Sequence, residues 1–239
     1  MSAAKSNHVN DKPSLKEWAK RLIQIIGLIV IMDGILFLLA GRLDWNGPWI
    51  LTFLYFVLLL VFVIWAMQNA PELLEERSRM AANVKGWDKI IMSLYTIMLI
   101  GLLVVAALDA GRFRWTEVPV ALQAVGSFGF ILCAIWLLWV FRTNAYLSRF
   151  ARIQEDRGQQ VITAGPYRYV RHPMYASMIL FFLCVALILG SWWALVPSAV
   201  LAILMTVRTA LEDQMLQEEL PGYKEYSQRV RYRLLPGIW

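Results

Sequence analysis

The sequence predicts an all-α fold, a polytopic bundle of about six transmembrane helices in which the last two form a helical hairpin. The chain of 239 residues is 59% hydrophobic and has a mean hydropathy of +0.54. A soluble protein of this size would leave much of that apolar surface without cover. Several apolar runs also reach the ~18 residues that can cross a hydrocarbon core of ~30 Å. One membrane-embedded bundle, with no separate soluble domain, accounts for both observations.

Apolar segments define the predicted spans, which are residues 22–40, 48–67, 90–108, 119–141, 173–189 and 192–207. The dipeptide Gly190-Ser191 is predicted to be the tight turn of the final hairpin. The polar segment 69–89 is predicted to be a solvated connector, or else a short helix on the membrane surface. Asp33 lies inside the first span, where a charge is costly. It marks function, is protonated, or bonds to a neighbouring helix, and the sequence leaves these alternatives open.

The basic residues predict the orientation of the bundle. Only Arg42, Arg112 and Arg114 fall on one face, whereas the other twenty of the 23 Lys and Arg residues fall on the opposite one. Because Lys and Arg are enriched in cytoplasmic segments, both termini are predicted to be cytoplasmic. The basic segments on that face are residues 1–21, 69–89, 142–171 and 208–239.

Two classes of partner are disfavoured by the same composition. The basic residues are spread over loops without an aromatic-basic module, so no nucleic acid is expected as a partner. Cys133 and Cys184 lie in apolar runs and lack metal-ligand spacing. We therefore expect them to be small core or lipid-facing residues, and we expect no metal site.

The stretch 165–175 carries the densest group of polar functional side chains. It holds three tyrosines, two arginines and a histidine where a polar segment meets the fifth span. Pro173 suits the first turn of a helix, because its missing N–H costs nothing there. The free N–H groups of such a helix favour a bound anion. The simpler alternatives are that the tyrosines anchor the interface, that His172 caps the helix, and that the arginines hold lipid phosphates.

A second polar cluster follows the last span. Arg208 and Glu212 are i,i+4 neighbours if the helix continues, and the simplest expectation is that they pair with each other and with lipid headgroups. Asp213 comes next, and a turn at 220–223 leads to Tyr226 and several arginines. This cluster shares a predicted face with the stretch 165–175.

Taken together, three elements of the chain resemble the integral-membrane methyltransferases. That superfamily includes isoprenylcysteine carboxyl methyltransferase and the phospholipid N-methyltransferases. The resemblance covers the C-terminal region of the chain, while the N-terminal spans match only in being apolar. The elements are Gln159-Gln160-Val161-Ile162-Thr163-Ala164-Gly165-Pro166-Tyr167, Arg171-His172-Pro173-Met174-Tyr175 and Arg208-x-x-x-Glu212-Asp213.

The resemblance implies a catalytic region at 142–239, after a cytoplasmic tail at 1–21 and N-terminal transmembrane helices at 22–141. It implies S-adenosyl-L-methionine as the cofactor, bound at the cytoplasmic face, and a lipidic or prenylated acceptor that enters from the bilayer. Arg208 and Glu212 are then the catalytic residues, with Arg208 facing the acceptor. The implied cofactor-binding residues are Gln159, Gln160, Val161, Ile162, Tyr167, His172, Pro173, Met174, Tyr175 and Glu212. The sequence departs from the family pattern at Gln159, where a histidine is common, and at Glu212-Asp213, where two glutamates are common.

The nature of the acceptor separates the subclasses. A carboxylate is nucleophilic at neutral pH, and Arg208 can orient it by a bidentate contact. An amine must first lose a proton, for which Glu212, Asp213 and His172 are candidates. The Arg208/Glu212 spacing favours the carboxyl O-methyltransferase type, acting on a prenylated cysteine or a similar lipid. The alternatives are a phospholipid N-methyltransferase and a non-catalytic protein that binds lipid or a partner.

Overall fold

The computed structural model describes residues 14–78 and 84–239, and those residues form helices and connecting loops without a β-strand. The predictions made for 1–13 and for Arg79 lie outside the described residues. The long helices are α1 (Leu15–Ala40), α2 (Asn46–Asn69), α4 (Gly86–Ala106), α5 (Val120–Thr143), α6 (Pro173–Ile188) and α7 (Leu195–Glu219). The short elements are α3 (Pro71–Ser78), α8 (Tyr223–Arg229), a π-helical turn at Ala107–Phe113 that extends α4, and 3₁₀ turns at Glu155–Arg157 and Gly165–Arg168.

The predicted polytopic helical bundle is confirmed, and the chain is a multi-pass membrane protein. Five of the described helices are long and apolar enough to cross a membrane, whereas α6 is a shorter apolar helix of 16 residues. The hairpin of α6 and α7 turns at Gly190, whose φ of +75° lies in the left-handed region that glycine adopts readily. The last helix starts later than predicted and continues to Glu219, so it carries both Arg208 and Glu212.

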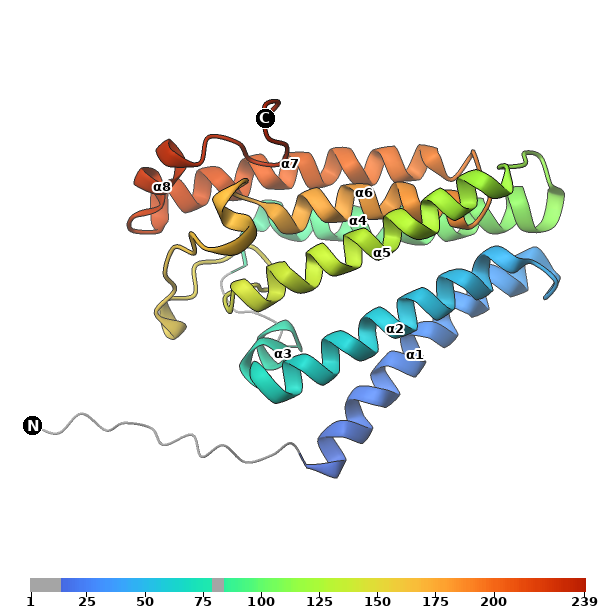
Figure 1. Cartoon of the computed structure of the whole chain (residues 1–239), viewed down its shortest axis with the longest axis horizontal. Coiled ribbons are helices and arrows are strands. Elements are labelled where there is room, and N and C mark those ends of the chain that lie inside the picture. The colour runs from blue at the N-terminus through green and yellow to red at the C-terminus, as the bar shows by residue number, and fades with distance from the viewer. Residues whose placement is uncertain (1–13, 79–83) are drawn as a thin grey trace, which may run out of the picture.

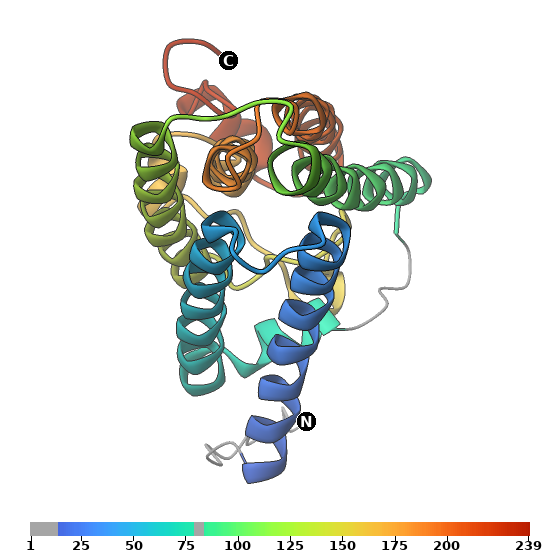
Figure 2. The ribbon, with the colours of Figure 1, turned by 90° about the vertical axis from the view of Figure 1, so that its right-hand side faces the viewer.

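Successive long helices run in opposite directions, and α4 to α7 lie side by side while α1 and α2 diverge from them (Figure 1; Figure 2). The contact of α5 with α6 is close because glycines of α5 face α6. A Cβ on Gly126 would lie 2.8 Å from the Cβ of Leu187, and a Cβ on Gly129 would lie 2.7 Å from the Sγ of Cys184. Small residues allow this approach between helices in a membrane.

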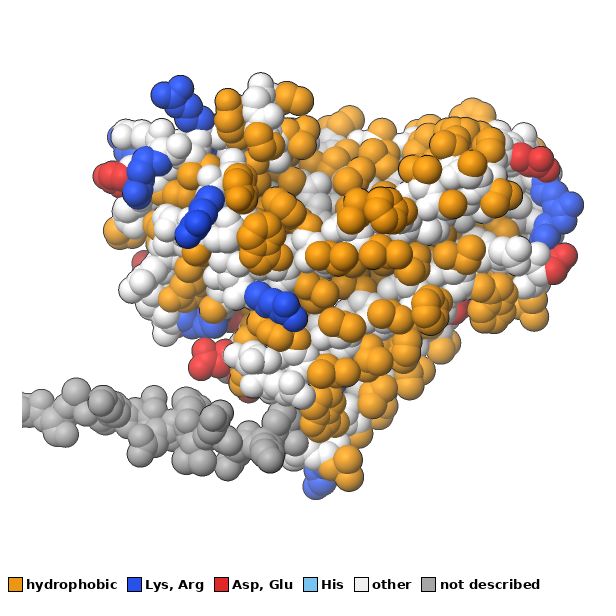
Figure 3. All heavy atoms as spheres, viewed as in Figure 1, with side chains coloured by type: hydrophobic (Ala, Val, Ile, Leu, Met, Phe, Trp, Pro, Cys, Tyr) orange, Lys and Arg blue, Asp and Glu red, His pale blue; other side chains and the backbone are white. Residues whose placement is uncertain are grey.

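The polar segments gather at one end of the bundle. Figure 1 shows α3, α8, the start of α1 and the loop between α5 and α6 at the same end. Lys and Arg lie near the two ends of the molecule, and hydrophobic side chains cover the surface between them (Figure 3). The arrangement agrees with the predicted sharing of one face, and the cytoplasmic position of that face stays a prediction.

Two polar features of the N-terminal half find partners across helices. Leu73, Leu74 and Glu76 of α3 are buried, and Glu76 accepts from Arg152 Nη2 at 2.8 Å, so α3 is more than the solvated connector predicted for 69–89. Asp33 Oδ1 accepts a hydrogen bond from Thr52 Oγ1 at 2.6 Å. Of the three alternatives for Asp33, the structure therefore supports bonding to a neighbouring helix.

Candidate active site

The stretch 165–175 begins with a turn that depends on glycine. Gly165 has a φ of +55°, and a Cβ there would lie 2.6 Å from the Oγ1 of Thr143 at the end of α5. The turn directs Tyr167 inward, where its hydroxyl accepts a hydrogen bond from Asn144 Nδ2 at 2.8 Å. Burial raises the pKa of the Tyr167 hydroxyl, so this group stays protonated at neutral pH. Tyr226 fastens the same turn to α8 by donating to the Tyr167 carbonyl at 2.7 Å.

The first turn of α6 begins at Pro173, as predicted. Trp136 of α5 donates its Nε1–H to the Pro173 carbonyl at 3.0 Å and so fixes where the helix starts. The backbone N–H groups of the first helical turn have no intrahelical acceptor by construction. Since Pro173, Met174 and Tyr175 line the cavity described below, this positive end of α6 borders it.

Asp213 holds the stretch 165–175 to the C-terminal tail. Its carboxylate is fully buried and accepts from Arg171 at 2.7 and 3.0 Å, from Arg233 at 2.9 Å and from the Tyr223 hydroxyl at 2.9 Å. Burial, followed by the charge of Asp213, raises the pKa of that tyrosine and keeps it a donor. His172 Nε2 lies 3.1 Å from the same carboxylate. Arg171 and His172 therefore serve this internal cluster, and Asp213, a candidate proton acceptor in the sequence, does not line the cavity.

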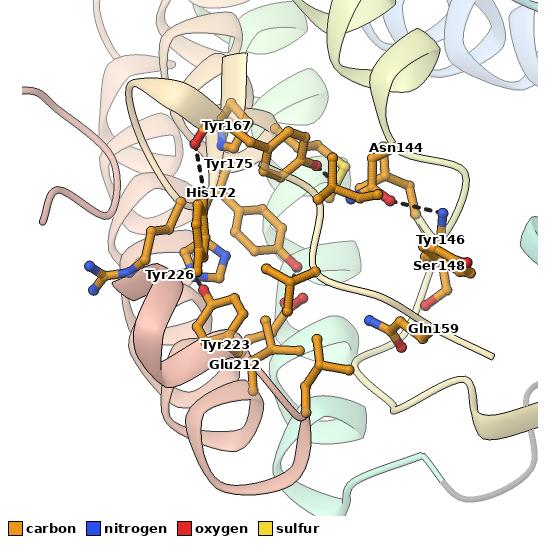
Figure 4. A pocket seen from close by; sticks show the side chains of 18 of the residues that line it. Asn144, Tyr146, Ser148, Gln159, Tyr167, His172, Tyr175, Glu212, Tyr223 and Tyr226 are labelled. Carbon is orange, nitrogen blue, oxygen red and sulfur yellow. Dashed lines mark hydrogen bonds between the residues drawn. The ribbon is translucent and has the colours of Figure 1, made fainter. Parts of the chain in front are cut away.

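All the predicted site residues border one cavity at the polar end of the bundle. It has about 770 Å³ of empty space, is partly open to solvent, and is formed by the loop after α5, the start of α6, the inner end of α7 and α8. Figure 4 shows the side chains of Tyr167, Tyr175, Glu212, Tyr223 and Gln159 around it. The predicted residues that line it are Gln159, Gln160, Val161, Ile162, Tyr167, His172, Pro173, Met174, Tyr175, Arg208 and Glu212.

Arg208 and Glu212 both reach the cavity, but they do not form the ion pair expected from their spacing. Arg208 donates Nε to Asp88 Oδ1 at 2.8 Å and Nη2 to Asp88 Oδ2 at 3.3 Å, and both side chains are buried. Its guanidinium also lies 5.3 Å from the centre of the Tyr175 ring. The Tyr175 hydroxyl in turn donates to Glu212 Oε2. Arg208 is thus hydrogen-bonded to Asp88 of α4 rather than to Glu212, and the Glu212 carboxylate borders the cavity.

Gln159 is held by the loop that it belongs to. Its Oε1 accepts the backbone N–H of Gln154 at 2.8 Å. The carboxamide nitrogen is therefore the part of this side chain that remains for a ligand. Gln159 thus supplies donors to the cavity at the position where the resembling family often has a histidine.

Several cavity residues were not among the predicted site residues. Asn144, Tyr146 and Ser148 form an alternating polar run just after α5, which is the only local signal that the sequence offers for them. Tyr223 and Tyr226 come from α8 and were noted only as part of the C-terminal cluster. Other lining residues that the prediction lacked are Leu147, Phe150, Arg152, Arg171, Leu216 and Leu220.

Known proteins match the part of the chain that builds this cavity. Residues 124–221 match the family model for phospholipid methyltransferase. The chain is 31% identical over 135 residues to the cobalt-zinc-cadmium resistance protein CzcN of Cupriavidus metallidurans, covering 53% of this chain and 56% of that protein. It is 26% identical over 137 residues to the nickel-cobalt-cadmium resistance protein NccN of Alcaligenes xylosoxydans xylosoxydans, covering 53% of this chain and 57% of that protein.

The chain therefore spans little more than half the length of these two relatives. The family match begins inside α5 and runs through α6 and α7 to the turn before α8, so it includes all of the predicted site residues in one continuous segment. Residues 124–221 are therefore similar to the phospholipid methyltransferase family, which lies in the superfamily of integral-membrane isoprenylcysteine and phospholipid methyltransferases.

Proposed function

We propose that this protein transfers the methyl group of S-adenosyl-L-methionine to the polar head of a lipidic acceptor in the membrane. One observation carries the proposal. Residues 159–162, Tyr167, residues 171–175, Arg208 and Glu212 come from separate parts of the chain, yet they line a single cavity.

The side chains around the cavity fit the chemical groups of this cofactor. When bound, S-adenosyl-L-methionine supplies an activated methyl group on a sulfonium centre. Glu212 can balance the positive charge, because its carboxylate lines the cavity and Arg208 forms its ion pair with Asp88. The start of α6 suits a carboxylate, Tyr167 and Tyr223 offer aromatic faces, and the Tyr167 hydroxyl, which accepts from Asn144, still has its proton to donate. The protein then acts by positioning and by excluding water, as displacement at an activated methyl group requires.

We favour a carboxylate as the acceptor, most simply that of a prenylated cysteine or a similar lipid. An amine acceptor needs a base, and the bases here are already engaged: His172 Nε2 faces Asp213 and Tyr223, and Asp213 lies outside the cavity. Glu212 remains, but in this proposal its carboxylate already faces the cationic centre of the cofactor. A carboxylate acceptor avoids this requirement.

N-methylation of a phospholipid is the second candidate. The family whose model matches residues 124–221 is described as phospholipid methyltransferase. In this case Glu212 and its hydrogen-bond partner Tyr175 are the candidates for removing the proton of the amine. The two candidates share the cofactor and the cavity and differ only in the acceptor.

The deciding experiment is methyl transfer from labelled S-adenosyl-L-methionine by the purified chain. The acceptors are a prenylated cysteine and total membrane lipid. Label that mild base releases is a methyl ester and supports the carboxylate acceptor, whereas base-stable label in lipid supports N-methylation. No transfer to either acceptor, together with no binding of the cofactor, contradicts the proposal and favours a non-catalytic lipid-binding protein.

Cofactor affinity tests the site residue directly. Glu212→Ala is expected to weaken binding of S-adenosyl-L-methionine about tenfold or more, because an interaction with a charged group is lost. The control is Glu218→Ala on the same helix, where the side chain is exposed and lies outside the cavity. Equal affinity of Glu212→Ala and the parent shows that Glu212 does not bind the cofactor.

A further inference from the structure

A second, larger cavity lies between the N-terminal helices and α5 and α6. It has about 1,320 Å³ of empty space, and apolar side chains dominate its lining. Representative lining residues are Leu51, Tyr55, Phe62, Leu99 and Phe181. The two cavities meet at Met174, whose side chain lines both of them.

One cation reaches into this apolar cavity. Arg77 of α3 lines it, with its guanidinium carbon 5.1 Å from the centre of the Phe141 ring. The Nη1 atom of Arg77 is buried and has no hydrogen-bond partner. Among the residues that the structure describes, no other buried side-chain nitrogen or oxygen lacks a partner.

The charges around Arg77 do not compensate it. The adjacent carboxylate, Glu76, is bound to Arg152. Arg149 and Arg208 are like charges close enough to lower the pKa of Arg77, after burial, which is the main cause of the lowering. Arg208 has its own carboxylate in Asp88. In the part of the chain that the structure describes, no carboxylate pairs with Arg77, and an unpaired buried cation is costly.

We propose that the second cavity binds an anionic amphiphile whose hydrocarbon lies among the apolar side chains and whose carboxylate or phosphate pairs with Arg77. Charge complementarity selects an anion, and a guanidinium holds either oxyanion by two parallel hydrogen bonds. Such a ligand supplies the partner that Nη1 lacks. The remaining lining, which is apolar, takes the hydrocarbon.

The position of the cavity identifies this amphiphile with the methyl acceptor, a step that rests on the proposed function. Met174 directly precedes Tyr175, which bonds to Glu212 in the first cavity. Arg77 lies close enough to Tyr175 and Arg208, which line the first cavity, for their charges to act on its pKa, so an anionic group at Arg77 lies near the boundary across which the methyl group must pass. Arg77 is then a specificity-determining residue on α3, outside the residues 124–221 that match the family.

The test is equilibrium binding to the full chain in detergent, without cofactor, with two pairs of probes. A prenylated N-acetylcysteine is compared with its methyl ester, and phosphatidic acid is compared with diacylglycerol. The parent is expected to prefer the anionic member of at least one pair by about tenfold or more, since hydrogen bonds to charged groups have this strength. The pair that shows the preference tells whether the anion is a carboxylate or a phosphate.

Variants of Arg77 connect the preference to this residue. Arg77→Gln is expected to bind the anionic and the neutral probe equally, and Arg77→Lys is expected to retain part of the preference because it keeps the charge. The control is Arg142→Gln, an exposed arginine near Trp65 that lines neither cavity. Cofactor binding by Arg77→Gln is expected to match the parent and shows that the variant is folded.

Two results overturn the inference. One is a parent protein that binds the anionic and neutral probes of both pairs equally. The other is an Arg77→Gln variant that keeps the preference of the parent. Because binding is measured without methyl transfer, a parent that shows the preference but methylates no acceptor contradicts the proposed function and leaves the anionic ligand of Arg77 supported.

Discussion

The two cavities differ in whether the buried charges beside them are paired within the protein. Around the first cavity, buried charges are paired within the protein: Asp213 with Arg171 and Arg233, and Asp88 with Arg208. In the second cavity, Arg77 reaches an apolar space with its Nη1 atom unpaired. A charge that the protein compensates holds the fold together, whereas a charge left without a partner provides for a ligand.

This difference gives each arginine a separate expected phenotype. Removing a compensated charge exposes its buried partner, and the main loss is stability. Removing an uncompensated charge removes the free-energy cost of burying it unpaired, and the main loss is then ligand binding. The predictions below follow this contrast, from the largest expected change in the free energy of unfolding to the smallest.

Asp213→Ala has the largest expected effect. It leaves Arg171 and Arg233 without their carboxylate and removes the acceptor of Tyr223, so we expect a loss of about 3–5 kcal/mol in the free energy of unfolding. The measurement is denaturant unfolding in detergent, with Glu218→Ala as the control on the same helix. A loss no greater than that of the control contradicts the structural role of this cluster.

The pair of Asp88 and Arg208 tests whether an ion pair between α4 and α7 stabilises the fold. A double-mutant cycle with Asp88→Asn and Arg208→Gln is expected to give a coupling energy of about 1–3 kcal/mol, because the two side chains share two hydrogen bonds out of contact with solvent. The cycle is measured by the same unfolding assay. Additive single effects mean that Arg208 is available to an acceptor after all.

Gly165→Ala tests the left-handed turn that begins the stretch 165–175. We expect a loss of about 1–2 kcal/mol from the left-handed conformation, increased by the contact of the new Cβ with Thr143 at 2.6 Å. Gly158→Ala is the matched control: its φ is +58°, and no atom lies within 4 Å of its Cβ position. The difference between the two variants isolates the steric contribution, and equal losses exclude it.

The sequence predicts the helical bundle and the residues that gather around the first cavity because both signals are local. Apolar runs give the spans, and Pro173 gives the start of α6. The elements at 159–162, 167–175 and 208–212 are short motifs, and each of them places residues on the cavity: the first from a loop, the second from a turn and the start of α6, and the third from one side of α7.

The ion-pair and hydrogen-bond partners of those residues could not be predicted from the sequence, because they depend on tertiary contacts. Asp88 lies at the start of α4, 120 residues from Arg208, and the i,i+4 spacing indicated Glu212 as the partner instead. Arg77 looked like one charge among several in a polar connector, although α3 folds back so that this side chain enters the bundle. Compensation of charge is a property of the folded chain, and no local pattern records it.

Arg77→Leu has the smallest expected effect on stability and sharpens the contrast most. The substitution removes an unpaired cation from an apolar cavity, which favours folding, and removes its contact with the Phe141 ring, which is worth about 0.5–1 kcal/mol. We therefore expect the free energy of unfolding to stay within about 1 kcal/mol of the parent or to rise. The unfolding assay used for Asp213→Ala measures it. A loss as large as that of Asp213→Ala shows that Arg77 is compensated within the protein, and the distinction between the two cavities then fails.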